Sequence, residues 1–319
     1  MKKANFCPSL FYKNMNESNN QTALVVGGAG FIGSTLVDEL IKEGWRVKII
    51  DNFLTGKKEN LNPEAEFYEL DVRNLEKIKP VFENVDYVFH LAAWPRIQIS
   101  IENPVESNDI NLVGTLNVLV AARDAKVKRM IYSASSSAYG RQEKNPWRED
   151  MAPNPISPYG LQKYVGEIYC RIFSEIYGLP TVCLRYFNVY GRRQSSEGAY
   201  CSVLGTFFNQ RKSGQTMTIV GDGEQKRDYT NVKDVVRANI LAAKSPKAGK
   251  GELINIGRGR SYSVNQVAQM IGGPKTNVAP RFEVKESLAD NARAKELLNW
   301  EPEVDLPDWI EEYKKEVGL

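Results

Sequence analysis

Histidine and cysteine are scarce in this chain, and each scarcity excludes a class of chemistry. His90 is the single histidine, which excludes a histidine-rich metal site. A Ser-His-Asp hydrolase needs a catalytic histidine, and if His90 is structural the chain has no other histidine for that role. We therefore expect no metal. The cysteines form neither a Cys-x-x-Cys pair nor the dense spacing of a disulfide framework: Cys7, Cys170, Cys183 and Cys201. This usage favours a reducing cytoplasm.

Long hydrophobic runs and an excess of one charge are missing as well. No apolar run approaches the roughly 20 residues that span a bilayer, and the N-terminal segment lacks the continuous apolar stretch of a secretory signal. The 42 basic residues nearly balance the 39 acidic ones, and no long basic block is interleaved with aromatics. Neither a membrane nor a nucleic acid is expected as a partner.

What the chain does have is length, with short apolar segments that alternate with helical periodicity. Its 319 residues suffice for a large core and for two lobes that share a cleft. The alternation predicts an α/β fold with a doubly wound parallel sheet. We expect strands at residues 22–26, 45–50, 66–70, 87–91, 129–133 and 181–186, and helices at residues 31–43, 111–125 and 159–177.

A glycine-rich turn separates the first expected strand from the first helix. Gly27 permits the tight turn, Gly30 lets the backbone approach a pyrophosphate, and Gly33 allows close packing of helix on strand. The helix N-terminus that follows is an anion site. The turn predicts dinucleotide binding, with a purely structural turn as the alternative.

Along the whole chain we expect a polar N-terminal extension over residues 1–21, a Rossmann domain over 22–187 and a smaller C-terminal α/β lobe over 188–319.

Carboxylates at the ends of the next strands bear on which dinucleotide binds. Asp51 can accept hydrogen bonds from a ribose diol and would repel a 2′-phosphate, which favours NAD over NADP. Asp51 is also a good turn residue, and Lys57 and Lys58 leave some room for a phosphate. Asp71 and Val72 follow another strand and could contact the adenine, although an ordinary strand cap explains them nearly as well.

Tyr159 and Lys163 carry the pattern of a proton-transfer pair. Their four-residue spacing places both on one helical face, where an ammonium group favours the ionised form of a phenol whose ordinary pKa is about 10. A solvated surface pair is the alternative for this spacing taken alone. The serine-rich stretch from Ser133 to Gly140 follows a buried strand, so one of its hydroxyls could share a proton with a substrate hydroxyl.

Together these motifs resemble the extended short-chain dehydrogenases/reductases, in the nucleotide-sugar epimerase branch typified by UDP-glucose 4-epimerase. The resemblance covers nearly the whole chain from Thr22 onward. Besides the glycine turn, Asp51-Asn52, the serine run and the Tyr-Lys pair, the matching segments are residues 90–93, Asn111 with residues 112–115, residues 185–191 and residues 221–228.

The resemblance implies a role for each matching residue. Tyr159 is the catalytic base, Lys163 binds the nicotinamide ribose and lowers the pKa of the tyrosine, and Ser135 assists. The further cofactor-binding residues that it implies are Phe31, Ile32, Asn52, Leu91, Ala92, Ala93 and Asn111. The substrate-binding residues are Arg96, Ser135, Ser137, Asn188, Arg227, Arg281 and Ser287. A UDP-sugar would be epimerised at C4 with NAD through a 4-keto intermediate, in a homodimer.

The same resemblance bears on the sugar. Ser136 and Ser137 stand where sugar dehydratases carry an Asp-Glu pair, and Ser137 stands where UDP-glucuronate decarboxylases usually carry a glutamate. Ser287 falls at the pocket gate, where a small residue leaves room for an N-acetyl group. This favours UDP-N-acetylglucosamine and UDP-N-acetylgalactosamine over UDP-glucose and UDP-galactose.

Other functions stay open. The segment at Arg281 is one residue shorter than the family pattern, and Arg96 could reach a carboxylate on the sugar, which keeps UDP-glucuronate and other nucleotide sugars in play. An NAD-sensing binding protein without turnover is an alternative of another class. Retention of Ser135, Tyr159 and Lys163 argues against it, because a sensor needs no proton-transfer group.

Overall fold

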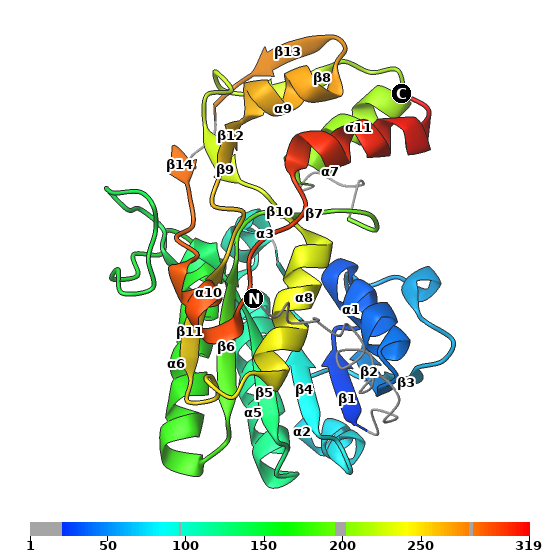
Figure 1. Ribbon diagram of the computed structural model, residues 1–319, viewed down its shortest axis with the longest axis vertical. Coiled ribbons are helices and arrows are strands. Elements are labelled where there is room, and N and C mark those ends of the chain that lie inside the picture. The colour runs from blue at the N-terminus through cyan, green and yellow to red at the C-terminus, as the bar shows by residue number, and fades with distance from the viewer. Residues whose placement is uncertain (1–20, 96, 195–201, 281–282) are drawn as a thin grey trace, which may run out of the picture.

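A seven-stranded parallel sheet carries the larger lobe, and helices cover both of its faces (Figure 1). The computed structural model describes residues 21–95, 97–194, 202–280 and 283–319. The strand order is β11-β6-β5-β4-β1-β2-β3. The strands are β1 (Thr22–Val26), β2 (Arg46–Asp51), β3 (Glu66–Glu69), β4 (Tyr87–His90), β5 (Arg129–Ser135), β6 (Thr181–Tyr186) and β11 (Glu252–Ile256). The predicted doubly wound sheet is confirmed, and the order reverses between β1 and β4.

Two apolar layers hold the helices on this sheet. One face packs against α1 (Phe31–Lys42), α8 (Val232–Lys244) and α10 (Ala292–Leu298). The other packs against α2 (Leu75–Ile78), α5 (Gly114–Asp124) and α6 (Pro158–Tyr177). The short helices α3 (Ile97–Glu102) and α4 (Pro104–Asn108) precede α5, and a π-helical turn, Asp109–Val113, leads into it. Because parallel strands are buried on both faces, their sequences are nearly continuous apolar runs.

The smaller lobe has its own core between α7 (Val203–Lys212), α9 (Val264–Ile271) and α11 (Leu306–Val317). Its strands pair in short sheets that lie above the carboxyl edge of the large sheet in Figure 1. They are β7 (Val189–Tyr190), β8 (Met217–Val220), β9 (Lys226–Asp228), β10 (Thr230–Asn231), β12 (Ser261–Ser263), β13 (Lys275–Val278) and β14 (Glu286–Ser287).

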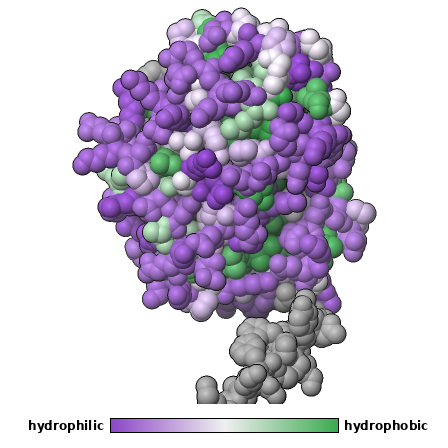
Figure 2. Space-filling view, turned by 45° about the horizontal axis from the view of Figure 1, so that its top comes forward, coloured by the Kyte–Doolittle hydropathy of each residue, from purple (hydrophilic) through white to green (hydrophobic). Residues whose placement is uncertain are grey.

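The chain passes between the lobes more than once. Helix α8 and strand β11 lie beyond residue 188, yet both belong to the large sheet and its helical layer. The expected boundary at residue 188 therefore separates the two lobes only in part. The face in Figure 2 is mostly hydrophilic, with small hydrophobic groups scattered among polar ones. Within the described residues, no helix has the length and hydrophobicity required to cross a membrane.

Candidate active site

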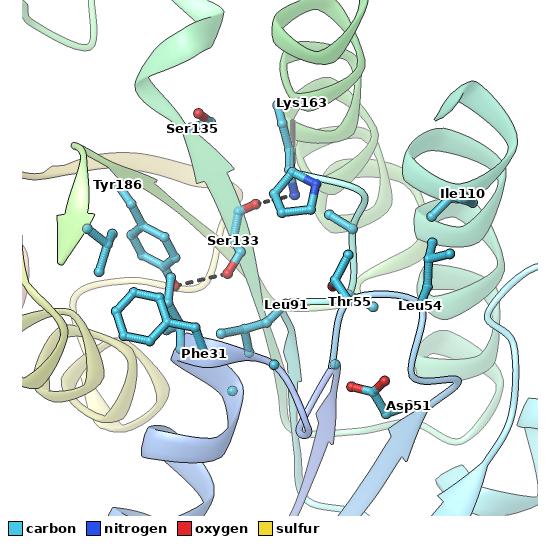
Figure 3. A pocket seen from close by; sticks show the side chains of 18 of the residues that line it. Phe31, Asp51, Leu54, Thr55, Leu91, Ile110, Ser133, Ser135, Lys163 and Tyr186 are labelled. Atoms are coloured by element: carbon cyan, nitrogen blue, oxygen red, sulfur yellow. Dashed lines mark hydrogen bonds between the residues drawn. The ribbon is translucent and has the colours of Figure 1, made fainter. Parts of the chain in front are cut away.

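A cleft of about 460 Å³ lies at the carboxyl edge of the large sheet and is lined by residues of both lobes (Figure 3). The sequence-predicted residues that line it are Gly27, Gly30, Phe31, Ile32, Gly33, Asp51, Asn52, Val72, Leu91, Ala92, Ala93, Ser135, Ser137, Tyr159, Lys163 and Asn188. Its position at the switch point of the sheet is the place where open α/β sheets bind ligands.

The floor of the cleft is the turn from β1 into α1, where the backbone is packed too closely for side chains. A Cβ on Gly27, whose φ is +91°, would lie 2.5 Å from the Ala92 nitrogen. A Cβ on Gly33 would lie 2.1 Å from the Gly27 carbonyl oxygen. Gly30 differs, because its Cβ would meet only that oxygen, at 3.3 Å, and would otherwise project into the cleft. No side chain caps α1, so its first N–H groups are open to an anion.

Asp51 lies at the end of β2, on the side of the cleft away from α6 (Figure 3). Its two carboxylate oxygens accept hydrogen bonds from the backbone N–H groups of Ala29 (3.0 Å) and Phe53 (2.8 Å). Burial raises the pKa of Asp51, and these donors oppose that rise. A carboxylate oxygen accepts more than one hydrogen bond, so Asp51 retains capacity for a ribose diol. The glycine cradle, the open helix N-terminus and Asp51 together fit NAD.

Tyr159 and Lys163 lie on the buried face of α6, one turn apart. Ser157 caps the helix, its hydroxyl accepting a hydrogen bond from the Gly160 N–H. Tyr159 therefore sits in the first turn, where the helix dipole favours an anion. The Tyr159 N–H donates to the Ser100 hydroxyl at 3.1 Å, which ties this turn to α3.

The Lys163 ammonium donates a 2.7 Å hydrogen bond to the Ser133 carbonyl at the end of β5 (Figure 3). The ammonium also lies 4.9 Å from the centre of the Tyr132 ring. Burial lowers the pKa of Lys163 to about 8. A lysine in this state carries its charge at neutral pH and loses it under mildly alkaline conditions.

The serine run forms the wall beside Tyr159. The Ser135 hydroxyl accepts a hydrogen bond from the Ser137 N–H at 3.2 Å and donates to the Ser137 hydroxyl at 3.1 Å. These contacts close the 3₁₀ turn Ser136–Ala138 that follows β5. The cleft thus receives two coupled hydroxyls that can exchange a proton or hold a sugar hydroxyl.

Four sequence-predicted site residues do not line the cleft: Asp71, Asn111, Arg227 and Ser287. Asp71 pairs with Arg73 at 2.6 Å, which lowers the pKa of the carboxyl group, and it accepts a 3.0 Å hydrogen bond from Asn52. Asn111 is buried, accepts from the Trp94 N–H at 2.7 Å and donates to Gln162 of α6 at 2.8 Å. Asn111 thus braces the segment beside Ala92 and Ala93.

The other two belong to a cluster above the cleft. Arg227 pairs with Glu283 at 2.6 Å, and Ser287 lies beside Arg227 across the pairing of β14 with β9. The Asn188 amide donates to the Ser287 hydroxyl at 3.3 Å and to the Asp228 carbonyl at 2.9 Å. Three predicted substrate residues therefore meet in the smaller lobe. Arg96 and Arg281 lie outside the described residues.

The cleft also has lining residues that were not predicted as site residues, among them Ser133, Tyr186 and Arg193. The Ser133 hydroxyl donates to the Tyr186 hydroxyl at 3.1 Å, which in turn donates to Asn239 at 2.9 Å. Tyr186 lies within the matching segment of residues 185–191 and Arg193 lies two residues after it, so proximity to Asn188 in the sequence was the available signal. His90 is fully buried and hydrogen bonds with Thr115; burial and the charge of Lys163 lower its pKa to about 3.

Comparison with known proteins agrees with this architecture. Residues 23–257 match the family model of the NAD dependent epimerase/dehydratase family. UDP-glucose 4-epimerase of Thermotoga maritima, solved with UDP-glucose, is 40% identical with a TM-score of 0.88, over 93% of this chain and 100% of that one. UDP-N-acetylglucosamine 4-epimerase of Methanobrevibacter ruminantium, solved with UDP-N-acetylmuramic acid, is 34% identical with a TM-score of 0.88, over 94% and 97%.

A third solved structure broadens the range of sugars. UDP-glucuronic acid 4-epimerase of Bacillus cereus, in complex with UDP-glucuronic acid and NAD, is 32% identical with a TM-score of 0.86, over 93% of this chain and 99% of that one. The chain belongs to the NAD dependent epimerase/dehydratase family. Within that family it is an NAD-dependent enzyme of the nucleotide-sugar 4-epimerase branch, as its motifs predicted.

The lowered pKa of Lys163 predicts the alkaline side of the pH profile. Because Lys163 loses its proton as the pH rises through about 8, Tyr159 loses the neighbouring positive charge, and kcat/KM should fall above that pH. In Lys163→Arg the arginine keeps its charge to much higher pH. Whatever activity this variant retains should therefore not show this fall, the alkaline limb of the profile. The measurement is kcat/KM from pH 6 to about 10. A flat profile for the unchanged enzyme would contradict the assigned role of Lys163.

Proposed function

We propose that the protein interconverts UDP-N-acetylglucosamine and UDP-N-acetylgalactosamine by epimerisation at C4. The observation that carries the proposal is the convergence of Ser135, Tyr159 and Lys163 on the same cleft as the glycine cradle. A proton-transfer group and a dinucleotide site in one cleft are what the oxidation and reduction of a sugar alcohol require. An NAD sensor would need only the second of these.

In the proposed mechanism, NAD would be held by the glycine turn, the N-terminus of α1 and Asp51, and would supply the hydride acceptor and donor for C4 of the sugar. Tyr159 takes the proton of the 4-hydroxyl and gives it back when the 4-keto sugar is reduced. The Lys163 ammonium favours the phenolate form of Tyr159. Ser135 and Ser137 hold the reacting oxygen through hydroxyls that can each donate and accept.

The diphosphate is proposed to lie between Asn188 and Arg227. The Asn188 side chain lines the cleft, and Arg227 is held above it by Glu283. For Arg227 to bind a phosphate, part of its contact with Glu283 has to be exchanged for the ligand. A diphosphate carries more charge than a carboxylate and can occupy several donors of one guanidinium group, which favours the exchange.

The N-acetyl preference rests on Ser287. This small residue is buried and contacts the cleft through Asn188, so a bulky residue at the same position would displace Asn188 toward the sugar. The relatives act on three kinds of sugar by their names, and the UDP-N-acetylglucosamine enzyme among them supports the proposal. UDP-glucose and UDP-glucuronate are the competing substrates.

Purified protein, incubated with each of the three UDP-sugars and followed by proton NMR, should convert UDP-N-acetylglucosamine with the highest kcat/KM. Ser287→Tyr should lower kcat/KM for the N-acetyl sugar at least about tenfold relative to UDP-glucose, because the larger ring reduces the pocket. Ser287→Ala, which keeps the volume small, is the matched control and should retain the preference. An equal loss of kcat/KM on all three sugars in Ser287→Tyr would contradict the proposal that Ser287 selects the N-acetyl sugar.

Tyr159→Phe should abolish epimerisation on every UDP-sugar and leave NAD binding intact, because the change removes only the phenol oxygen. Tyr169→Phe removes the same atom from the same helix and should behave as the unchanged enzyme. Turnover and bound NAD would both be measured on purified protein. Full activity in Tyr159→Phe would refute the mechanism, and absence of turnover in the unchanged protein with all three sugars would favour the binding-protein alternative.

We also propose a homodimer that packs through α4, α5 and α6. An apolar groove of about 380 Å³ lies there, between residues of α4 and α6 that include Val105 and Leu161. Their exposed fractions, 76% and 51%, are high for such side chains. A second copy of the same helical face would cover these residues by two-fold symmetry.

Leu161→Arg should convert the dimer into a monomer, because two charged groups would face an apolar partner across the symmetry axis. Val278→Arg places the same charge on β13, where the replaced valine is 42% exposed, and should leave the dimer intact. Sedimentation equilibrium distinguishes the two states. An unchanged protein that sediments as a monomer would rule out the dimer.

A cytoplasmic location is proposed from cysteine chemistry. Cys170 and Cys183 are buried neighbours on α6 and β6 and remain free thiols. A reducing compartment keeps such a pair reduced.

A further inference from the structure

Directly behind Lys163, a buried ion pair joins the catalytic helix to the sheet. Glu167 of α6 accepts hydrogen bonds from Arg185 of β6 at 2.7 and 2.6 Å, one on each carboxylate oxygen. The side chains are only 6% and 1% exposed. A buried pair of this kind contributes little net stability compared with apolar residues of the same volume, so its presence calls for another explanation.

The helical spacing connects this pair to the chemistry. Tyr159, Lys163 and Glu167 follow one another at intervals of four residues, so they lie on the same face of α6 in successive turns. The Lys163 ammonium donates to a neutral carbonyl, that of Ser133, which does not compensate its charge. The carboxylate of Glu167 is one turn further along the buried face.

Besides Tyr159 and Glu167, the titratable groups that the structure describes around Lys163 are His90, Tyr132, Cys170 and Cys183, and none of them is a carboxylate. His90 of β4 is neutral, because its pKa is lowered to about 3. Burial raises the pKa of Tyr132 on β5, and the hydrogen bond with Cys170 together with burial raises that of Cys183 on β6, so both remain uncharged near neutral pH. Asp51 lies on the far side of the cleft (Figure 3).

We propose that Glu167 is a positioning residue for the reaction: its carboxylate keeps the buried Lys163 protonated, and Arg185 keeps that carboxylate ionised and directed away from Tyr159. The function of Arg185 follows from its geometry, since both of its bonds go to Glu167 while its guanidinium lies 4.2 Å from the centre of the Tyr139 ring. Without Arg185, a glutamate at this depth would take up a proton. This inference rests on the proposed role of Lys163 in turnover.

The first test is the pH dependence of kcat/KM in Glu167→Gln. Loss of the anion should move the alkaline limb to lower pH by roughly two units, as expected for a charge one helical turn, about 6 Å, away at an effective dielectric near 20. Glu167→Asp keeps the charge and should restore most of the limb. Glu175→Gln removes the same charge from an exposed position of α6 and should match the unchanged enzyme. An unshifted limb in Glu167→Gln would overturn the proposal.

A second variant separates electrostatics from folding, because Glu167→Gln leaves Arg185 buried without its partner. The double change Glu167→Leu with Arg185→Met removes both charges and fills the space with apolar groups, which such pairs tolerate. Its alkaline limb should still lie below that of the unchanged enzyme. A limb at the original pH would show that the pair only holds helix to sheet.

The third measurement does not depend on turnover. With ¹⁵N-labelled lysine, the Nζ chemical shift of Lys163 gives its pKa directly, and Lys163→Arg identifies the signal. Glu167→Gln should lower that pKa by roughly two units, in agreement with the kinetic limb. A lowered pKa in a protein without epimerase activity would support the proposal and refute the proposed function. An unchanged Lys163 pKa in Glu167→Gln, together with epimerase activity in the unchanged enzyme, would refute the role of Glu167 and support the proposed function.

Discussion

The close approach of two backbone segments at the start of α1 is the constraint on which the cleft depends. Gly27 and Gly33 touch through backbone atoms alone, and a single methyl group on Gly33 would fall 2.1 Å from a carbonyl oxygen. This contact sets the first turn of α1 against the ends of β1 and β4. Since helix N–H groups point out of that turn, the anion site and the floor of the cleft result from the same packing.

Helix α6, which carries Tyr159 and Lys163, is attached to this floor from the other side. Helix α6 is capped at Ser157, bound to β5 through Lys163 and the Ser133 carbonyl, and bound to β6 through Glu167 and Arg185. Each contact joins a buried polar group to a strand end that the parallel sheet already positions. Tyr159 is therefore held by rigid elements, as proton transfer over hydrogen-bond distances requires. The burial that provides rigidity also lowers the pKa of Lys163.

Much of the large lobe could be predicted from the sequence, because strands buried on both faces and a glycine turn leave a strong local signal. The bounds of β1 and β6 agree with the expected residues 22–26 and 181–186. The return of β11 to the sheet was missed, since a five-residue strand more than 60 residues after β6 has no local feature that assigns it to either lobe. The role of Asn111 was also beyond spacing alone, because it lies in a π-helical turn and its partners, Trp94 and Gln162, are 17 and 51 residues away in the sequence.

Contacts between distant segments explain why the smaller lobe was harder to predict. The buried carboxylate of Asp228 accepts hydrogen bonds from the N–H groups of Arg258, Gly259 and Ala289, segments that are 30 to 61 residues away. The next contact in this cluster, from Asn188 to the Asp228 carbonyl, fixes a residue that lines the cleft. Under the proposed function, the glycine turn and the Tyr-Lys pair serve any sugar of this chemistry. A change of substrate would then act through the segments that Asp228 gathers, and the face of α6 that carries Tyr159 and Lys163 can stay as it is.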